Sequence, residues 1–261
     1  MEATRHSRCV EPVVCSMDTK RRLVKPLFKY YDHYAMTPSI VKILNNDGNG
    51  DIYSLLKTRD SVAGESYLNV LARGARDADL PWSWGYILHT YHYHHPWTHR
   101  GYLTYRSAAD VLAALFTTGQ KLWTHGRRNR AMYQLGRMLH LVQDMFIPHH
   151  AAVTAIRGHG QLETWLSGNW HRHRVDRGGC YAWENTFSNP GAATHTVSSQ
   201  NPYDWIEAGS HVSIEWYRKY FLDFKDTSIP AFFPELADEV IPCMLRYSAG
   251  FIDRFFIGLT L

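Results

Sequence analysis

Residues 139–150, with the sequence LHLVQDMFIPHH, set histidines and an aspartate among large apolar side chains. His140 and Asp144 are four residues apart, so on an α-helix they project from the same face. The other side chains are apolar on nearly every side, which predicts a buried helix. A buried carboxylate is costly unless it is paired or bound to a metal ion. The segment therefore predicts a buried metal-binding helix, which Pro148 ends before directing His149 and His150 back toward the site.

A second pair of metal-binding residue types follows nine residues after His150. His159 and Glu163 are again a histidine and an acid at a spacing of four. Such a pair on its own is common on helix surfaces. Beside the first cluster, it indicates the second half of one site.

Helical patterns dominate the rest of the chain. Thr37-Pro38-Ser39 precedes an apolar run and predicts a capped helix with proline at an early position. Residues 45–51, NNDGNGD, predict a turn rather than a calcium loop, because Thr58 stands where a bidentate glutamate belongs. Further helices are expected at residues 52–75, 107–124, 129–147, 160–170, 204–220 and 233–245, with a last one through 256, and irregular stretches at 77–103 and 175–203. The expected class is all-α, with a flexible N-terminal lead over residues 1–22 and a single compact multi-helix domain over residues 23–261.

Composition narrows the classes of function. Of the 261 residues, 45% are hydrophobic, which is enough for a sizeable core, and no apolar run approaches the roughly 20 residues that cross a bilayer. The formal net charge of +4 is too small to indicate nucleic-acid binding by itself. The four cysteines are scattered without a Cys-x-x-Cys pair, which argues against a thiolate zinc site. The sixteen histidines include a dense run at residues 89–95, and histidine is the commonest metal ligand.

The spacing resembles that of the zinc-dependent phospholipase C family, which includes bacterial phosphatidylcholine-hydrolysing enzymes and the catalytic domain of clostridial alpha-toxin. The family fingerprint is His-x-x-x-Asp-x-x-x-Pro-x-His followed by His-x-x-x-Glu. Here it is filled by His140, Asp144, Pro148, His150, His159 and Glu163. Upstream, Asp79, His92 and His33 stand where the family has further ligands, and residues 201–206, NPYDWI, resemble a downstream family segment. The resemblance covers about residues 30–255 and implies a compact all-α fold.

The resemblance also implies a site of two to three zinc ions. One ion would be held by Asp79, His92, His140 and Asp144, a second by His150, His159 and Glu163, and a third by His33 together with Asp144. Carboxylate and imidazole ligands suit zinc in a hydrolytic site. Asp79 would also act catalytically, as the base that orients the attacking water.

The sequence departs from the family pattern at several places. The family binds its third metal partly through an N-terminal tryptophan, and the first tryptophan here is Trp82. His95 replaces an acid, and Leu80 and His89 stand where choline-binding relatives have aromatic residues. The aromatic residues between Trp82 and Trp97 are open to two interpretations, the lining of a pocket or membrane contact on one side and ordinary packing on the other.

Three functions remain open at this point. The first is a phospholipase C that cleaves the glycerol–phosphate bond of phospholipids, giving diacylglycerol and a phosphorylated headgroup. The second is a nuclease, since single-strand-specific zinc nucleases share the central motif, although they usually close the last pair with aspartate where this chain has Glu163. The third is a metal-binding homologue with reduced or no turnover.

The first function is favoured, and it carries expectations about partners and compartment. The expected partner is a phospholipid, with transient contact to a membrane surface, no nucleic acid, and a monomeric chain. The resemblance suggests secretion, whereas no signal peptide is recognisable at the start of the sequence.

Overall fold

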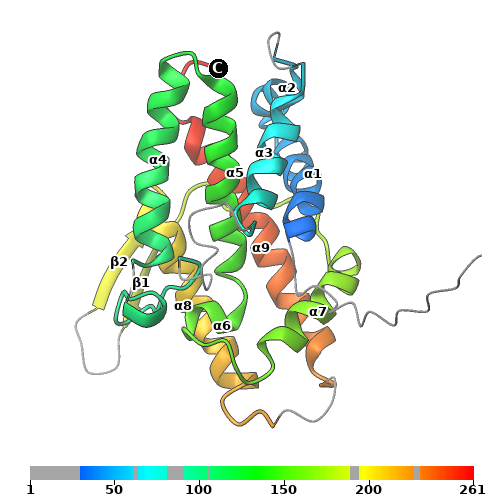
Figure 1. The fold of residues 1–261 in the computed structure, drawn as a ribbon, viewed down its shortest axis with the longest axis vertical. Coiled ribbons are helices and arrows are strands. Elements are labelled where there is room, and N and C mark those ends of the chain that lie inside the picture. The colour runs from blue at the N-terminus through cyan, green and yellow to red at the C-terminus, as the bar shows by residue number, and fades with distance from the viewer. Residues whose placement is uncertain (1–29, 61–63, 81–90, 105, 189–193, 226–229) are drawn as a thin grey trace, which may run out of the picture.

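The computed structural model describes residues 30–60, 64–80, 91–104, 106–188, 194–225 and 230–261 (Figure 1). The lead expected over residues 1–22 lies outside these ranges. Helices make up most of the described chain, which confirms the all-α class. They are α1 (Tyr30–Asn46), α2 (Gly50–Lys57), α3 (Tyr67–Asp77), α4 (Ala108–Thr124), α5 (Arg128–Asp144), α6 (Pro148–Ala151), α7 (His159–Asn169), α8 (Pro202–Tyr220) and α9 (Phe233–Phe256), with short 3₁₀ turns at Tyr102–Thr104 and Trp170–Arg172.

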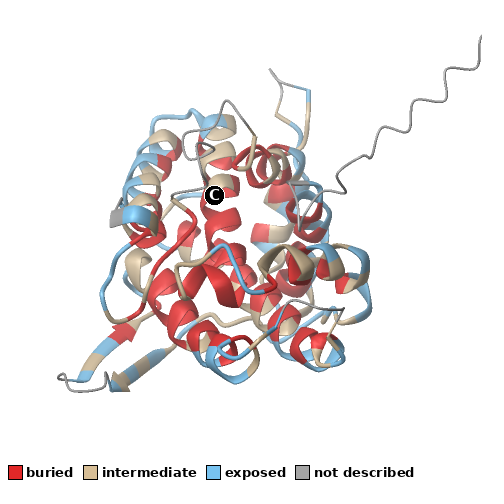
Figure 2. Cartoon of the chain, turned by 60° about the horizontal axis from the view of Figure 1, so that its bottom comes forward, coloured by how far each residue is buried: buried red, intermediate tan, exposed pale blue. Residues whose placement is uncertain are grey.

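Helix α5 occupies the middle of the molecule, and α3, α4 and α9 pack around it (Figure 1). Its second half is buried on every side from Met138 to Asp144, as the apolar pattern predicts. Figure 2 shows the buried residues gathered on the facing sides of the helices, with exposed residues on their outer sides. The helical segment that is buried on every side is thus also the one that carries the central metal-binding motif.

Helices α3 and α5 approach each other so closely that glycine is needed on both. A Cβ atom at Gly136 would lie 2.0 Å from the carbonyl oxygen of Leu71, and one at Gly74 would lie 2.2 Å from the carbonyl oxygen of Tyr133. This close approach brings the C-terminal end of α3 against the middle of α5. His140 of α5 therefore lies within hydrogen-bonding reach of the α3 backbone, with its Nδ1 atom 2.9 Å from the carbonyl oxygen of Ala75.

Several predicted helix boundaries are wrong. Helix α1 begins at Tyr30, so Pro38 lies inside it rather than near its start. The helix expected over residues 52–75 is two helices, α2 and α3, and the two helices expected after residue 233 are one, with Pro242 inside it. Proline indicates the first turn of a helix from sequence because that position needs no backbone N–H donor. Pro38 and Pro242 nevertheless lie inside helices, because packing of the turns on either side stabilises the helix there.

The end of the central helix also differs from the prediction. Helix α5 ends at Asp144, and Pro148 occupies an N-terminal position of the short helix α6 rather than closing α5. The backbone bends between the two helices through Met145–Ile147, all three of which are fully buried. The bend turns His150 back toward the end of α5, as the sequence predicts.

A β-hairpin lies within the stretch predicted to be an irregular loop. Strands β1 (Glu184–Ser188) and β2 (Thr194–Ser198) pair antiparallel, with Phe187 opposite His195. Both strands are largely polar, and Val197 is their one buried residue, so no alternation of apolar residues marks them in the sequence. No helix within the described ranges is long and apolar enough to span a membrane.

Candidate metal centre

The structure brings all eight predicted metal-binding residues together. They come from α1 (His33), the turn after α3 (Asp79), the segment before α4 (His92), α5 (His140 and Asp144), α6 (His150) and α7 (His159 and Glu163). Their nitrogen and oxygen atoms form three groups that could hold a metal ion, with the atoms of each group within 4.8 Å of one another. The groups are His33, Asp79 and His140; His92, His140 and Asp144; and His150, His159 and Glu163.

Asp144 is the centre of this arrangement. Its Oδ2 atom lies 2.6 Å from Nδ1 of His92 and 3.1 Å from Nε2 of His140, and its Oδ1 atom lies 3.3 Å from Nε2 of His33. Burial acts to raise the pKa of this carboxyl group, but His140 and His150 outweigh it and hold the pKa well below its usual range. Asp144 is therefore an ionised carboxylate whose two oxygens face different imidazoles.

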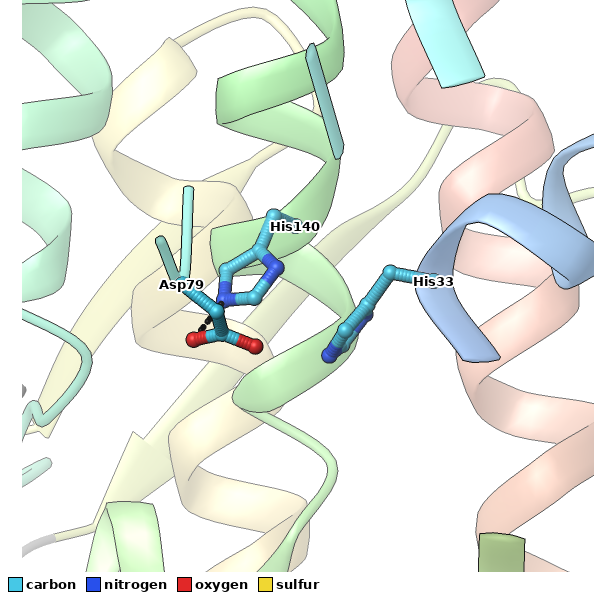
Figure 3. Close-up of side chains that lie close together, drawn as sticks. All are labelled: His33, Asp79 and His140. Atoms are coloured by element: carbon cyan, nitrogen blue, oxygen red, sulfur yellow. Dashed lines mark ion pairs between the residues drawn. The ribbon is translucent and has the colours of Figure 1, made fainter. Parts of the chain in front are cut away.

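Asp79 and His33 approach His140 from opposite sides (Figure 3). The Oδ1 atom of Asp79 lies 3.3 Å from Nε2 of His140 and 3.7 Å from Nδ1 of His92. Burial lowers the pKa of His140, while Asp144 and Asp79 act the other way and raise it well above its ordinary value. The two carboxylates thus favour positive charge at this point of the site.

The second ring nitrogens of two histidines are held by neighbouring groups. Nδ1 of His140 donates to the carbonyl oxygen of Ala75, and Nδ1 of His33 lies 2.5 Å from Oε1 of Gln143. Each bond leaves Nε2 directed at a carboxylate. Metal-binding histidines are usually oriented in this way by a hydrogen bond at the other nitrogen. The sequence interpretation did not include Gln143, although its place next to Asp144 on a buried helix is a signal that a polar partner is needed there.

The third group lies between α6 and α7. Nε2 of His159 lies 2.8 Å from Oε1 of Glu163 and 3.2 Å from Nε2 of His150. Burial acts to raise the pKa of Glu163, but His159 and His150 lower it to about 2. The pair four residues apart on α7 is therefore part of the same buried site and not a surface pair.

The structure distinguishes His150 from His149. Nε2 of His149 donates to the carbonyl oxygen of Arg157 at 3.1 Å, and its ring stacks on His159 with the planes 17° apart. Burial lowers the pKa of His149 to about 3, so the ring is neutral and supports its neighbours. The nitrogens of His150, in contrast, face Asp144 and Glu163.

The donor set fits zinc. With zinc–ligand bonds of about 2.0–2.2 Å in tetrahedral geometry, two ligand atoms on one ion lie roughly 3.3–3.6 Å apart. The separations here run from 2.6 Å for His92 and Asp144 to 3.7 Å for His92 and Asp79. Imidazole and carboxylate donors without thiolate are the usual ligands of hydrolytic zinc. The assignment of individual residues to individual ions stays a prediction.

The departures from the family pattern fall at the border of this site. His95 is half-buried and accepts weak hydrogen bonds from the backbone N–H groups of Trp97 and Thr98, so it shapes a turn and joins none of the three groups. Leu80 directly follows Asp79 and is partly exposed. His89 and the aromatic residues Trp82, Trp84 and Tyr86 lie outside the described residues.

A second group of histidines surrounds Glu207 on α8 and was missed from the sequence. The residues are His94, His99, His195, Glu207 and His211. A signal was present, since Glu207 and His211 repeat the spacing of four seen at His140 and Asp144 and at His159 and Glu163. The partners of this pair come from the segment before α4 and from β2, which no local pattern brings together.

The sequence matches a known family model, and the fold matches known structures. A family model described as "Zinc dependent phospholipase C" matches residues 33–232. No curated protein matches the sequence. Among solved structures, the alpha toxin of Clostridium absonum superimposes with a TM-score of 0.67 at 18% identity, over 86% of this chain and 62% of the toxin chain. The alpha-toxin of an avian strain of Clostridium perfringens gives a TM-score of 0.63 at 19% identity, over 85% and 62%. The chain therefore spans 62% of the length of these toxins and shares their fold.

Proposed function

The chain belongs to the zinc-dependent phospholipase C family, and from this premise we propose that it is a phospholipase C that hydrolyses the glycerol–phosphate bond of phospholipids. The products would be diacylglycerol and a phosphorylated headgroup. The observation that carries the proposal is the convergence of eight imidazole and carboxylate donors in one buried site, where the two oxygens of Asp144 face His33 and His92.

The proposed division of the ligands follows the family. Asp79, His92, His140 and Asp144 would hold one ion, His150, His159 and Glu163 a second, and His33 with Asp144 a third. The structure also groups His33 with Asp79 and His140. Because Nδ1 of His140 donates to Ala75 and its Nε2 is assigned to the first ion, Asp79 is the residue of this group that could supply a further oxygen to the third ion.

Charge favours an anionic substrate at this site. Three dications against the carboxylates of Asp79, Asp144 and Glu163 would leave a net positive charge of three, and a phosphodiester is an anion. When bound, zinc polarises phosphoryl oxygens and lowers the pKa of water toward neutrality. The chain's own residues hold this charge in a site whose ligands are mostly buried, where electrostatic interactions are stronger than in water.

Asp79 is the proposed catalytic base. Its side chain is 14% exposed, compared with 6% for Asp144 and 9% for Glu163, so it is the most accessible of the three carboxylates. Nε2 of His140 holds one of its oxygens at 3.3 Å. Asp79 would orient the attacking water and accept its proton. The bond between phosphorus and the glycerol oxygen would break, and the glycerol oxygen would leave as an alkoxide that takes a proton from solvent.

The test combines metal analysis with two substrates. We expect the purified protein to bind two to three zinc ions per chain in this site and to release phosphocholine from phosphatidylcholine vesicles. Asp144→Asn should lose most of the metal of this site and most of the activity, because its carboxylate faces imidazoles on both sides. Asp238→Asn is a matched control, since Asp238 is 72% exposed and pairs with His173 at the surface.

Three outcomes would contradict the proposal. Full metal content and full rate in Asp144→Asn would refute the site. Hydrolysis of single-stranded DNA without hydrolysis of phospholipid would indicate the nuclease instead. Metal binding without hydrolysis of any phosphodiester would indicate a homologue that has lost turnover.

A further inference from the structure

A second set of metal-binding side chains surrounds the buried carboxylate of Glu207, apart from the three groups described above. This set, the Glu207 cluster, consists of His94, His99, His195, Glu207 and His211. Its members come from three places: the segment before α4, strand β2 and helix α8. The Glu207 side chain is 2% exposed, and an ionised carboxylate at such a depth needs compensating charge or several hydrogen bonds.

The two oxygens of Glu207 are surrounded differently. The Oε2 atom accepts hydrogen bonds from Nε2 of His94 at 2.5 Å and from Nδ1 of His99 at 3.0 Å. The Oε1 atom faces Nε2 of His195 at 3.2 Å and Nε2 of His211 at 3.3 Å. Neither of these two approaches has hydrogen-bond geometry, and within the described ranges none of the three atoms makes a hydrogen bond.

The separations around Oε1 are those of ligands on a common ion. Zinc bonds of about 2.05 Å at tetrahedral angles place two donor atoms roughly 3.3 Å apart. Each buried polar atom that makes no hydrogen bond costs folding free energy. One cation at the centre of these three metal-donor atoms would satisfy all three. We propose that Oε1 of Glu207, Nε2 of His195 and Nε2 of His211 bind a divalent transition-metal ion, with zinc the best match.

His94 and His99 have a supporting role in this proposal. Their hydrogen bonds hold Oε2, which fixes the orientation of the carboxylate and directs Oε1 at the other two imidazoles. Ligating carboxylates are commonly held by such outer partners. The ring of Phe187 stacks on His211 with centroids 3.9 Å apart and planes 7° apart, which fixes the orientation of that ligand too.

The site lies beside a cavity. The side chain of His195 is 30% exposed, and a cavity of about 450 Å³ is lined by Phe187, His211, Trp97 and Arg218 among others. The three donor atoms themselves are buried, so the edge of the site approaches solvent only at His195 and His211. With three protein ligands, a water molecule would complete tetrahedral coordination of zinc.

The proposed ion would join separate parts of the fold. It would tie the β1–β2 hairpin, through His195, to helix α8, through Glu207 and His211. His94 is two residues from His92 of the central metal site, and its backbone N–H donates to the carbonyl oxygen of His150 at 3.2 Å. Occupancy of the Glu207 cluster would therefore steady the segment that carries His92.

Metal content of the intact chain tests this inference directly. Compared with wild type, His195→Asn should contain one fewer zinc ion per chain, and Glu207→Gln should give the same loss. His195 is partly exposed on a hairpin, so its variant should fold even if the buried change at Glu207 does not. His173→Asn is the matched control, because His173 also pairs with a carboxylate, Asp238, but belongs to no metal-binding group among the described residues.

Hydrogen exchange gives a readout that is independent of activity. Amide exchange in residues 184–188 and 194–198 should accelerate in His195→Asn and on chelation of wild type, and it should not change in the control. Equal zinc content in wild type and in both variants would overturn the inference. Loss of one ion from the His173 control as well would also overturn it. The result is separable from the proposed function, because an Asp144→Asn chain should retain the ion at Glu207.

Discussion

Replacing Gly136 with alanine tests whether the close contact of α3 and α5 positions the metal site. The added Cβ would lie 2.0 Å from the carbonyl oxygen of Leu71 and 2.8 Å from both the backbone nitrogen of Ala75 and the Cα atom of Gly74. These are backbone atoms on a buried helix, so they cannot yield by a change of rotamer. The helices must separate by about 1 Å before the shortest contact reaches 3.0 Å, the lower limit of real Cβ contacts.

The expected loss of stability follows from two opposing effects. Gly to Ala in the middle of a helix normally stabilises by about 0.5–1 kcal/mol. Overpacking of a tight core usually costs about 1–3 kcal/mol, and the displacement of two backbones favours the upper end. The net expectation is a decrease of roughly 1–2 kcal/mol in the free energy of unfolding.

The same displacement should weaken metal binding. The hydrogen bond from Nδ1 of His140 to the carbonyl oxygen of Ala75 is 2.9 Å long and spans the two helices, so a separation of about 1 Å would break it. Loss of a hydrogen bond that orients a metal ligand typically lowers metal affinity about 10–100-fold. We therefore expect weaker zinc binding together with the loss of stability.

Urea unfolding and zinc titration of the Gly136→Ala variant measure both effects. Gly168→Ala is the control, since Gly168 lies in helix α7 and a Cβ there meets nothing within 4 Å. The control should keep its zinc affinity and should not lose stability. If Gly136→Ala matched the control in both measurements, the close contact would not position His140.

Two further predictions concern charge and metal. Asp47→Asn should destabilise the fold by about 1–3 kcal/mol at neutral pH, because the Asp47 carboxylate accepts hydrogen bonds from the N–H groups of Gly178 and Gly179 and from the hydroxyl group of Tyr181. Burial acts to raise the pKa of Asp47, but these hydrogen bonds outweigh it and lower the pKa in the folded protein. The stabilisation by the carboxylate is therefore fully present above the pKa of Asp47 in the unfolded chain, and it is lost as the pH falls through the pKa of Asp47 in the folded protein. Unfolding curves of the variant and wild type should therefore converge in acid; a constant difference would contradict the role. Chelation should lower the melting temperature by about 5–10 °C for each zinc ion removed if zinc had been present at 100 times its dissociation constant, and an unchanged temperature would show that metal does not stabilise the fold.

Two residue pairs of the candidate metal centre can be found from the sequence because the members of each pair are local. His140 and Asp144 lie one turn apart on a helix, and so do His159 and Glu163, so the spacing alone places each pair. Asp79, His92 and His33 were named only through the resemblance to a family, since nothing local connects them. The position of His33 depends on how α1 packs against α3 and α9, and that of Asp79 on how α3 packs against α5. His92 lies in the irregular segment before α4.

The Glu207 cluster could not be assembled from the sequence for the same reason. Glu207 and His211 are visible as a pair, but His195 lies on a hairpin whose strands carry no apolar alternation. Pro38 shows a different limit. Its ring removes one backbone hydrogen bond from α1, at a cost of about 3 kcal/mol in an isolated helix. Packing of the fully buried Met36 and Ile40 on either side outweighs that cost, and local sequence rules contain no information on such packing.

The surroundings of Asp77 differ from those of the buried carboxylates in the candidate metal sites. Asp77 is buried, but the guanidinium group of Arg76 lies 2.6 Å from it and supplies a permanent positive charge. Asp144, Glu163 and Glu207 are surrounded instead by imidazoles, which carry charge only when protonated and otherwise offer one N–H and one lone pair. Where the lone pair of an imidazole faces the carboxylate, a dication that binds both donor types satisfies them together. By this criterion Glu207 belongs with Asp144 and Glu163, and the inference at Glu207 rests on the same physical ground as the proposed central site.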